Sequence, residues 1–335
     1  MSDCRMRMVA AKICGWSRLA AWLLLAACSQ DAPTPADSVL PSPDTRPAGL
    51  VAPEAEWRVL ASGYVYTDAP AVSASGELFF AAPMQDRIFR MPIAGEPAVF
   101  AADTQMAMGL NFAADGRLYA CSNRGASIVA YSTAAQRTVV YQGELTPLPG
   151  NPDAAGEFCN DVAVRRDGGL WFTDRVNERV LFLGPEGDLQ VVADGFRPNG
   201  IQLSLDEQLL VVTDSNAPRL WAFAVQTDGS LREQPGYFPA VRTVSRRGAE
   251  DVRGRPGSNG LTVDADGRFY LSSFYGIQVY DRDGRYLGAI DKPAGFVSNL
   301  TFAGADRRML VATGVKSIWG LTMQVAGPAA PARAK

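Results

Sequence analysis

The chain has 335 residues, with 32 lysines and arginines against 35 aspartates and glutamates, and 47% of its residues are hydrophobic. This composition excludes a disordered or collagen-like chain, and it lacks the basic excess of a nucleic-acid-binding domain. The 32 glycines and 22 prolines favour a turn-rich β protein. Because the chain has no histidine, Ser–His–Asp and Cys–His catalytic systems and imidazole metal ligands are excluded. Any chemistry must use carboxylates, amides, hydroxyls, lysine, tyrosine, cysteine or a metal bound through oxygen.

Residues 1–27 have the pattern of a secretory signal. Four basic residues lie between positions 5 and 18 and precede the apolar run 19–27, which is too short to span a bilayer. The sequence Leu-Ala-Ala-Cys at positions 25–28 resembles the bacterial lipobox, in which the cysteine is lipidated and becomes the mature N-terminus. The alternative is an ordinary cleaved signal with an incidental cysteine. We expect a periplasmic protein anchored by lipid at Cys28, and Ser29 after it matches sorting to the outer membrane.

The two ends of the mature chain have compositions that do not favour a buried core. Residues 28–53 contain six prolines among Ser, Asp and Ala, which predicts an extended tether. Residues 326–335 predict a disordered tail. We therefore expect the folded domain to cover residues 54–325.

Within that domain a turn followed by an apolar strand recurs six times. Three of the turns are Asp-Gly, a strong signal for a β-hairpin between alternating apolar residues. A second strand signal follows each turn, and the period of roughly 40 residues or more suits four strands. The second turn residues are at positions 76, 116, 168, 207, 267 and 307. This repeat predicts an all-β fold, a six-bladed β-propeller.

Counting back eight residues from each of these turn residues gives one equivalent position in every repeat. Five of these six positions hold Asp or Asn, residue types that are depleted from strands. The six residues are Asp68, Met108, Asn160, Asn199, Asn259 and Asn299. Because the innermost strands of a propeller line its central channel, the register predicts a ring of oxygens at one mouth of the channel. Oxygen ligands with few charges suit a hard cation, Ca²⁺ above all. The alternative is that the Asn-Gly and Asn-Asp pairs only mark turns or bulges.

Several of these segments carry a family resemblance that covers roughly residues 60–325. The matching stretches are Asn160-Asp161 leading to 169–174, then 197–201, 259–264 and 298–304. They resemble the senescence-marker-protein/gluconolactonase (regucalcin-like) family, six-bladed propellers whose members are lactonases or related esterases. The resemblance implies one divalent metal on the axis, which polarises the lactone carbonyl and lowers the pKa of an attacking water. It implies Ca²⁺ first, with Zn²⁺, Mn²⁺ and Mg²⁺ as alternatives.

The resemblance implies that the metal ligands of this chain are Asp68, Asn160, Asn199 and Asn259. Asp68 stands where the family has Glu, and Asn259 stands where it has the Asp that is the usual general base. The chain therefore has one carboxylate among the expected ligands, which predicts weaker Ca²⁺ binding. Asp68 and the position of Asn259 are the expected catalytic positions.

The expected substrate-binding residues are Asn160, Asp161 and Phe158. Phe158 stands where some sugar-lactone members have an Arg that meets the substrate, which favours a less polar ligand. Asp161 is a further proton acceptor, but strand alternation predicts that it points off the face of Asn160.

Two functions of different classes follow from these residues. The first is a metal-dependent hydrolase of lactones or related cyclic esters. The second, favoured by the amide of Asn259, is a non-catalytic periplasmic propeller that binds a metal, a small ligand or a protein partner. A lyase or isomerase on the same scaffold is a third possibility. We expect a small ester or lactone as partner, no nucleic acid, and a monomer.

Two further features concern the domain itself. Cys121 and Cys159 lie in neighbouring repeats, and two buried thiols are favoured over a disulfide. The charged segment 242–255 in the longest insertion is predicted to be a solvated loop, with a lid or a partner surface as the alternative.

Overall fold

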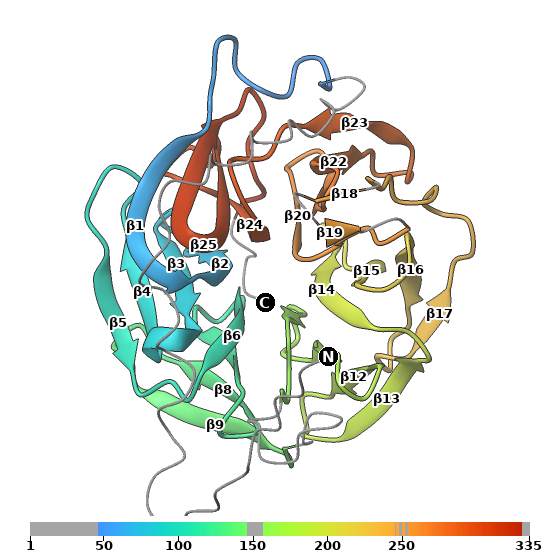
Figure 1. Ribbon diagram of the computed structural model, residues 1–335. Coiled ribbons are helices and arrows are strands. Elements are labelled where there is room, and N and C mark those ends of the chain that lie inside the picture. The colour runs from blue at the N-terminus through green and yellow to red at the C-terminus, as the bar shows by residue number, and fades with distance from the viewer. Residues whose placement is uncertain (1–45, 146–156, 245, 248–249, 252–253, 330–335) are drawn as a thin grey trace, which may run out of the picture. The chain divides into compact units, whose positions relative to one another are not determined.

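The computed structural model describes residues 46–145, 157–244, 246–247, 250–251 and 254–329 (Figure 1). Apart from one 3-10 turn at Pro83–Gln85, the regular structure of these residues is β-strand. No helix within them is long and apolar enough to cross a bilayer. The expected signal segment and Cys28 lie outside the described residues.

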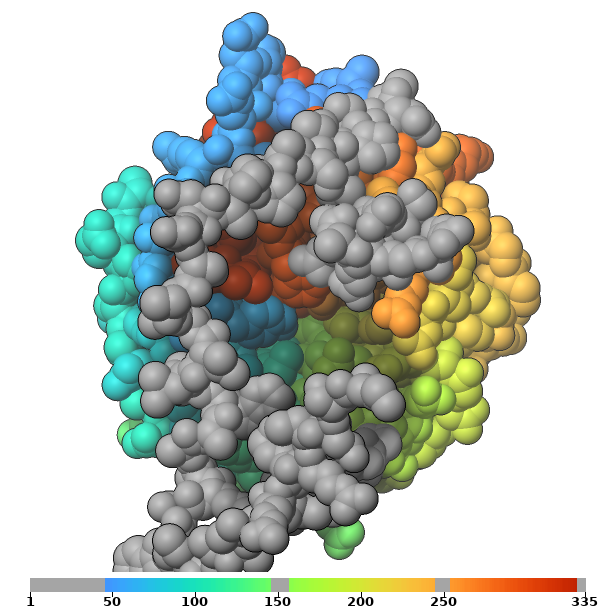
Figure 2. Space-filling model, in the orientation of Figure 1, coloured from blue at the N-terminus to red at the C-terminus, as the bar shows by residue number. Residues whose placement is uncertain are grey.

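Six antiparallel sheets surround a central axis and follow one another in chain order, as predicted (Figure 1). Figure 2 shows the same order, from blue to red, around a recessed centre. Blade one contains β2 (Asp68–Val72), β3 (Leu78–Ala82), β4 (Arg87–Met91) and β5 (Ala98–Ala102). Blade two contains β6 (Ala107–Phe112), β7 (Leu118–Ser122), β8 (Ser127–Tyr131) and β9 (Arg137–Gln142). Blade three contains β10 (Val162–Val164), β11 (Leu170–Asp174), β12 (Arg179–Leu183) and β13 (Leu189–Asp194).

The next two blades have the same strand order. Blade four contains β14 (Pro198–Leu203), β15 (Leu209–Asp214), β16 (Leu220–Val225) and β17 (Leu231–Glu233). Blade five contains β20 (Leu261–Val263), β21 (Phe269–Ser272), β22 (Ile277–Tyr280) and β23 (Tyr286–Ile290). Between them, β18 (Arg246–Arg247) and β19 (Glu250–Asp251) form a small hairpin in the segment that we expected to be a loop without strands.

Blade six joins the two ends of the domain. Its strands are β24 (Val297–Ala303), β25 (Met309–Thr322) and β1 (Arg58–Tyr66). The first part of β25 pairs with β24 and the second part pairs with β1, with Lys316 in a left-handed conformation between them. The outer strand of the last blade is therefore supplied by the N-terminal end of the domain, and this pairing closes the ring.

The predicted turns occur where the inner strand of each blade meets the second strand. In four blades the turn residue is a glycine with φ between +83° and +97°, at positions 76, 116, 168 and 267. This conformation is open to glycine at little steric cost. Glu207 and Arg307 adopt the left-handed conformation at the equivalent turns of blades four and six. The turn repeat therefore marked the blades correctly, even where glycine is absent.

The hydrophobic core is divided among the interfaces between successive blades, each of which contains a cluster of buried side chains. Between blades three and four, the fully buried Trp171 packs against Phe182 with ring centroids 4.8 Å apart. Its Nε1 donates to the carbonyl oxygen of Gly229 at 3.0 Å, so the buried indole has its polar partner.

The folded domain is longer at both ends than the predicted range 54–325. Leu50 and Val51 are buried, and Val51 forms a β-bridge with Met323. At the other end, Gly327 donates to the carbonyl of Arg307 at 2.8 Å. Apolar side chains therefore dock part of the predicted tether onto blade six, and backbone hydrogen bonds order part of the predicted tail.

Candidate functional site

The predicted ring positions all lie within three residues of the start of an inner strand, at one face of the propeller. The strand pairing is irregular at this level in four blades, next to Asp68, Met108, Pro198 and Val297. Such irregularities redirect side chains and end regular pairing. Of the pairs that were interpreted as possible bulges, Asn199-Gly200 lies within such an irregular stretch, and a bulge there is compatible with a cluster of oxygens around the axis.

Asp161 lines the axial channel, and its direction relative to the side chain of Asn160 stays a prediction. Its Oδ2 accepts hydrogen bonds from Nδ2 of Asn299 at 3.3 Å and from the N–H of Ile201 at 3.4 Å. Its Oδ1 accepts from the N–H of Val162 at 2.9 Å. The regular strand β10 begins only at Val162, so Asp161 lies just before it.

Asn299 occupies the level of Asp161 and not that of Asn160, one residue away from the predicted equivalence. Thr313 Oγ1 donates to the carbonyl of Asn299, as Thr173 Oγ1 does to the carbonyl of Asp161. In both residues the side-chain oxygen also accepts from the next N–H along the chain. Blade six therefore contributes an amide that holds the carboxylate of blade three from across the channel.

The two axial carboxyl groups, Asp68 and Asp161, influence each other. Burial raises the pKa of Asp161 to about 7, and the nearby charge of Asp68 acts in the same direction. Burial also raises the pKa of Asp68, against the lowering effects of Tyr66, the Ala69 N–H, Ser298 and Arg175. Burial therefore favours the protonated form of both carboxyl groups, and for Asp161 the charge of Asp68 adds to this effect.

Tyr66 and Arg175 belong to this site and were missed by the sequence analysis. Tyr66 donates its hydroxyl to Oδ2 of Asp68 at 2.7 Å, and burial together with the charge of Asp68 raises the pKa of Tyr66. The positive charge of Arg175 lowers the pKa of both groups, which places the guanidinium near them. Arg175 Nε also donates to Glu157 at 3.2 Å. No repeat or motif marks these residues, because their roles depend on contacts between blades.

The remaining ring residues offer oxygen donors that the protein does not use. The side chains of Asn160 and Asn259 make no hydrogen bond to any described residue, and Asn160 is 8% exposed. Asn199 donates its Nδ2 to Ser215 Oγ at 3.2 Å and keeps its Oδ1 free. Within the described ranges, no three His, Cys, Asp or Glu side chains come together as a metal site. One carboxylate with three amides, Asp68 with these asparagines, is chemically suited to a hard cation such as Ca²⁺.

Buried hydroxyls tie these segments from blade to blade. Thr173 of blade three donates to the carbonyl of Asn199 in blade four at 2.6 Å. Thr213 of blade four donates to the carbonyl of Asn259 at 2.8 Å, and Ser272 of blade five donates to Val297 at 2.8 Å. The second strand of one blade therefore fixes the ring segment of the next.

Between blades two and three, Asn123 and a disulfide fix the ring segment. The fully buried Asn123 accepts from the N–H of Phe158 at 2.7 Å and of Cys159 at 3.1 Å, and donates to the carbonyl of Cys159 at 3.0 Å. Cys121 and Cys159 form a disulfide with a Cα–Cα distance of 5.3 Å, so the expectation of two free thiols is wrong. Both contacts fix the backbone that leads directly into Asn160 and Asp161.

Phe158 packs into the core between blades two and three. Its ring centroid lies 5.7 Å from that of Phe172 and 6.4 Å from that of Tyr141, and the residue is 9% exposed. The structure therefore places most of this side chain against protein, where it supports the segment of Asn160.

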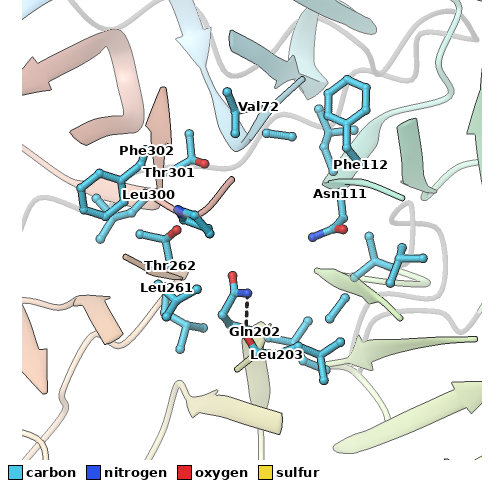
Figure 3. Close-up of a pocket in the computed structure, with 18 of the residues that line it drawn as sticks. Val72, Asn111, Phe112, Gln202, Leu203, Leu261, Thr262, Leu300, Thr301 and Phe302 are labelled. Carbon is cyan, nitrogen blue, oxygen red and sulfur yellow. Dashed lines mark hydrogen bonds between the residues drawn. The ribbon is translucent and has the colours of Figure 1, made fainter. Parts of the chain in front are cut away.

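From Asp161 and Asn299 a channel of about 210 Å³ continues along the axis towards the opposite face. The inner strands of all six blades line it, and Figure 3 shows side chains from several blades facing the central space. Arg166, Glu207 and Arg307 lie towards the far end, together with Pro328 and Ala329. The ring and the channel form one continuous axial feature.

Comparison with known proteins agrees with this architecture. The profile of the SMP-30/gluconolactonase/LRE-like region matches residues 60–316. A gluconolactonase of Zymomonas mobilis is 26% identical over 231 residues, which are 61% of this chain and 59% of that protein. A gluconolactonase structure from Xanthomonas campestris aligns with 26% identity and a TM-score of 0.67, covering 84% of this chain and 96% of that one. The calcium-binding regucalcin of Agrobacterium tumefaciens aligns with 18% identity and a TM-score of 0.66, covering 84% and 98%. With most of its propeller matched by the family profile and the six blades in place, the chain belongs to the SMP-30/gluconolactonase/LRE-like family.

Proposed function

We propose that this protein is a metal-dependent hydrolase of lactones or related cyclic esters, with its active site at the axial ring. The observation that supports the proposal is a set of oxygen donors near the starts of the inner strands, the buried carboxylate of Asp68 and the unused amide oxygens of Asn160, Asn199 and Asn259. Family membership and the relative named gluconolactonase support the reaction class. The chain spans 59% of the length of that relative.

Ca²⁺ is the cation that we propose, because hard oxygen ligands predominate and the neighbour from Agrobacterium tumefaciens is titled a calcium-binding protein. A divalent cation bound to the four side chains would supply polarisation of the lactone carbonyl and a lower pKa for a bound water. Asp68 would be the only charged member of this set, and Tyr66 and the Ala69 N–H fix the orientation of its carboxylate.

The proton released by the attacking water needs an acceptor. Asn259 is an amide and cannot accept it near neutral pH. Asp68 and Asp161 are the carboxylates on the axis that can do so, and Asn299 holds Asp161 in place. The positive charge of Arg175 lowers the pKa of Asp68, and the guanidinium of Arg175 is ion-paired with Glu157.

The test uses residues 46–335, without the lipid-anchored end. The protein is treated with EDTA and assayed against aliphatic, aromatic and sugar lactones, with and without added Ca²⁺, Mn²⁺, Zn²⁺ or Mg²⁺. We expect metal-dependent turnover that Asn199→Ala abolishes and that Asn216→Ala, an exposed control, leaves unchanged. No turnover with any metal, in protein that is folded by circular dichroism, would contradict the proposal.

The second candidate is a non-catalytic binding propeller, which the amide of Asn259 favours. Calorimetric titration separates the two functions. Saturable Ca²⁺ binding that Asn199→Ala removes, without hydrolysis of any lactone, would support the binding protein.

We also propose that the mature chain is a monomer held at the outer membrane, on the periplasmic side, through a lipid on Cys28. The basic and apolar segments before this cysteine support the proposal. Labelling with a radioactive fatty acid and membrane fractionation test it, and Cys28→Ser should release the protein from the membrane fraction. Light scattering of the protein without its anchor tests the monomer.

A further inference from the structure

The axial channel contains a second set of polar side chains, beyond Asp161 and Asn299. Asn111, Gln202, Thr262 and Thr301 come from the inner strands of blades two, four, five and six. Figure 3 shows their polar ends facing the central space. They form an uncharged polar layer inside a cavity of about 210 Å³, which is roughly the volume of seven water molecules.

Thr262 and Thr301 are buried and Asn111 and Gln202 are half-buried, and each has a polar atom without a partner in the described protein. Thr262 is 7% exposed and Thr301 is 8% exposed, and neither hydroxyl makes a hydrogen bond to any described residue. The amide of Asn111 is also free among these residues. Gln202 donates to the carbonyl of Leu203 at 2.9 Å and keeps its Oε1 for another partner. The free polar atoms of this layer face the channel, where they can hydrogen-bond to a polar occupant.

The end of the channel away from Asp161 carries positive charge. Arg307 is partly buried, and its Nη2 donates to the carbonyls of Ser73 and Ala74. It forms no ion pair with a described carboxylate, and burial lowers its pKa. Arg166 lies nearby with its guanidinium 3.7 Å from Glu207, so that charge is largely compensated. The positive charge of Arg307 therefore favours a ligand with an anionic group at this end of the channel.

We propose that the channel is a second small-molecule site, separate from the axial ring, for a small carboxylate that carries several hydroxyl groups. The hydroxyls bind Asn111, Gln202, Thr262 and Thr301, and the carboxylate lies towards Arg307. The opposite orientation would place the carboxylate beside the buried carboxyl of Asp161 and away from the positive charge of Arg307. Opening a hydroxylated lactone gives a compound of this class, so the site suits retention of product, but it does not depend on hydrolysis by this protein.

The site is tested by calorimetric titration of residues 46–335 with D-gluconate in EDTA, so that the metal ring plays no part. We expect one site per chain. Sorbitol, which has the hydroxyls without the carboxylate, and hexanoate, which has the carboxylate without the hydroxyls, should each bind at least tenfold more weakly.

Variants locate the binding. Thr262→Val with Thr301→Val keeps the shape and should weaken gluconate binding at least tenfold, as should Arg307→Gln, whereas the exposed Thr133→Val should have no effect. Asn199→Ala at the ring should also leave the affinity unchanged. If the double variant fails to fold, Arg307→Gln and the ligand series on the unmodified protein decide the question.

The proposal would be overturned if gluconate showed no saturable binding at tens of millimolar, because water would then be the occupant of the channel. Equal binding of gluconate, sorbitol and hexanoate would also overturn it. Loss of binding in Asn199→Ala would do so as well, because it would place the ligand at the ring. Because no turnover is measured, an inactive protein can still pass this test, and an active one can still fail it.

Discussion

The buried carboxyl of Asp161 should make the stability of the metal-free protein depend on pH. Burial, assisted by the charge of Asp68, raises the pKa of Asp161 from 3.8 to about 7, although the N–H of Val162 acts in the opposite direction. The native protein then keeps a proton that the unfolded chain releases. The contribution of Asp161 to stability is therefore largest at acidic pH and falls as the pH rises from about 4 to 7, where the native carboxyl ionises.

The size of the effect follows from this shift. One pKa unit corresponds to about 1.4 kcal/mol, so a shift of roughly three units corresponds to about 4 kcal/mol in total. Between pH 5 and pH 8 the expected loss of unfolding free energy is about 2–3 kcal/mol. Asp161→Asn has no proton to release and resembles the protonated side chain in shape, so this variant should lose that part of the pH dependence.

Urea unfolding in EDTA at pH 5, 6, 7 and 8 measures the free energy of unfolding of both proteins. Asp103→Asn, which changes an exposed carboxylate, serves as the matched control and should keep the pH dependence of the unmodified protein. An Asp161→Asn variant with the same slope as the unmodified protein would refute the reasoning, because the pH dependence would then come from another group.

Three further changes test how the ring is supported. Asn123→Ala removes the hydrogen bonds to the backbone at residues 158 and 159. This variant should lower the free energy of unfolding by about 2–3 kcal/mol, measured by urea unfolding, and weaken Ca²⁺ binding at least tenfold, measured by calorimetry. Unchanged Ca²⁺ affinity would show that this segment does not need Asn123 for its position. Thr213→Val leaves the carbonyl of Asn259 without its buried donor and should cost about 1–3 kcal/mol in urea unfolding, whereas Thr133→Val should cost nearly nothing. Replacing Cys121 and Cys159 by alanine removes a covalent link between positions 38 residues apart and should lower the unfolding free energy by about 2–4 kcal/mol. A denaturation midpoint that dithiothreitol does not change in the unmodified protein would contradict that expectation.

The fold was predictable because it repeats. Each turn at the end of an inner strand has a local signature, and six copies at similar spacing determine both the strand content and the number of blades. The ring of Asp and Asn residues was predictable for the same reason. The offset of Asn299 was not, because blade six has one more residue between its turn and the ring, which only the pairing of β24 with β25 reveals.

The other differences concern contacts that depend on tertiary structure. The hydrogen bond between Asp161 and Asn299 joins blades three and six, which are far apart in the sequence. The Cys121–Cys159 disulfide and the proximity of Arg175 to Asp68 arise from packing between neighbouring blades. No local pattern contains that information.

The pairing of β1 with β25 also bears on how the chain reaches its native state. Arg58 pairs with Gly320, so one of the first strands to be synthesised can pair only after one of the last has been made. Until then blade six lacks its outer strand, and β1 is an unpaired edge that other chains can recognise. Long-range pairing of this kind slows folding, since a large loop must close before the contact forms. The joint that completes the ring is therefore the point at which assembly is slowest and the unfinished chain is most prone to associate with its neighbours.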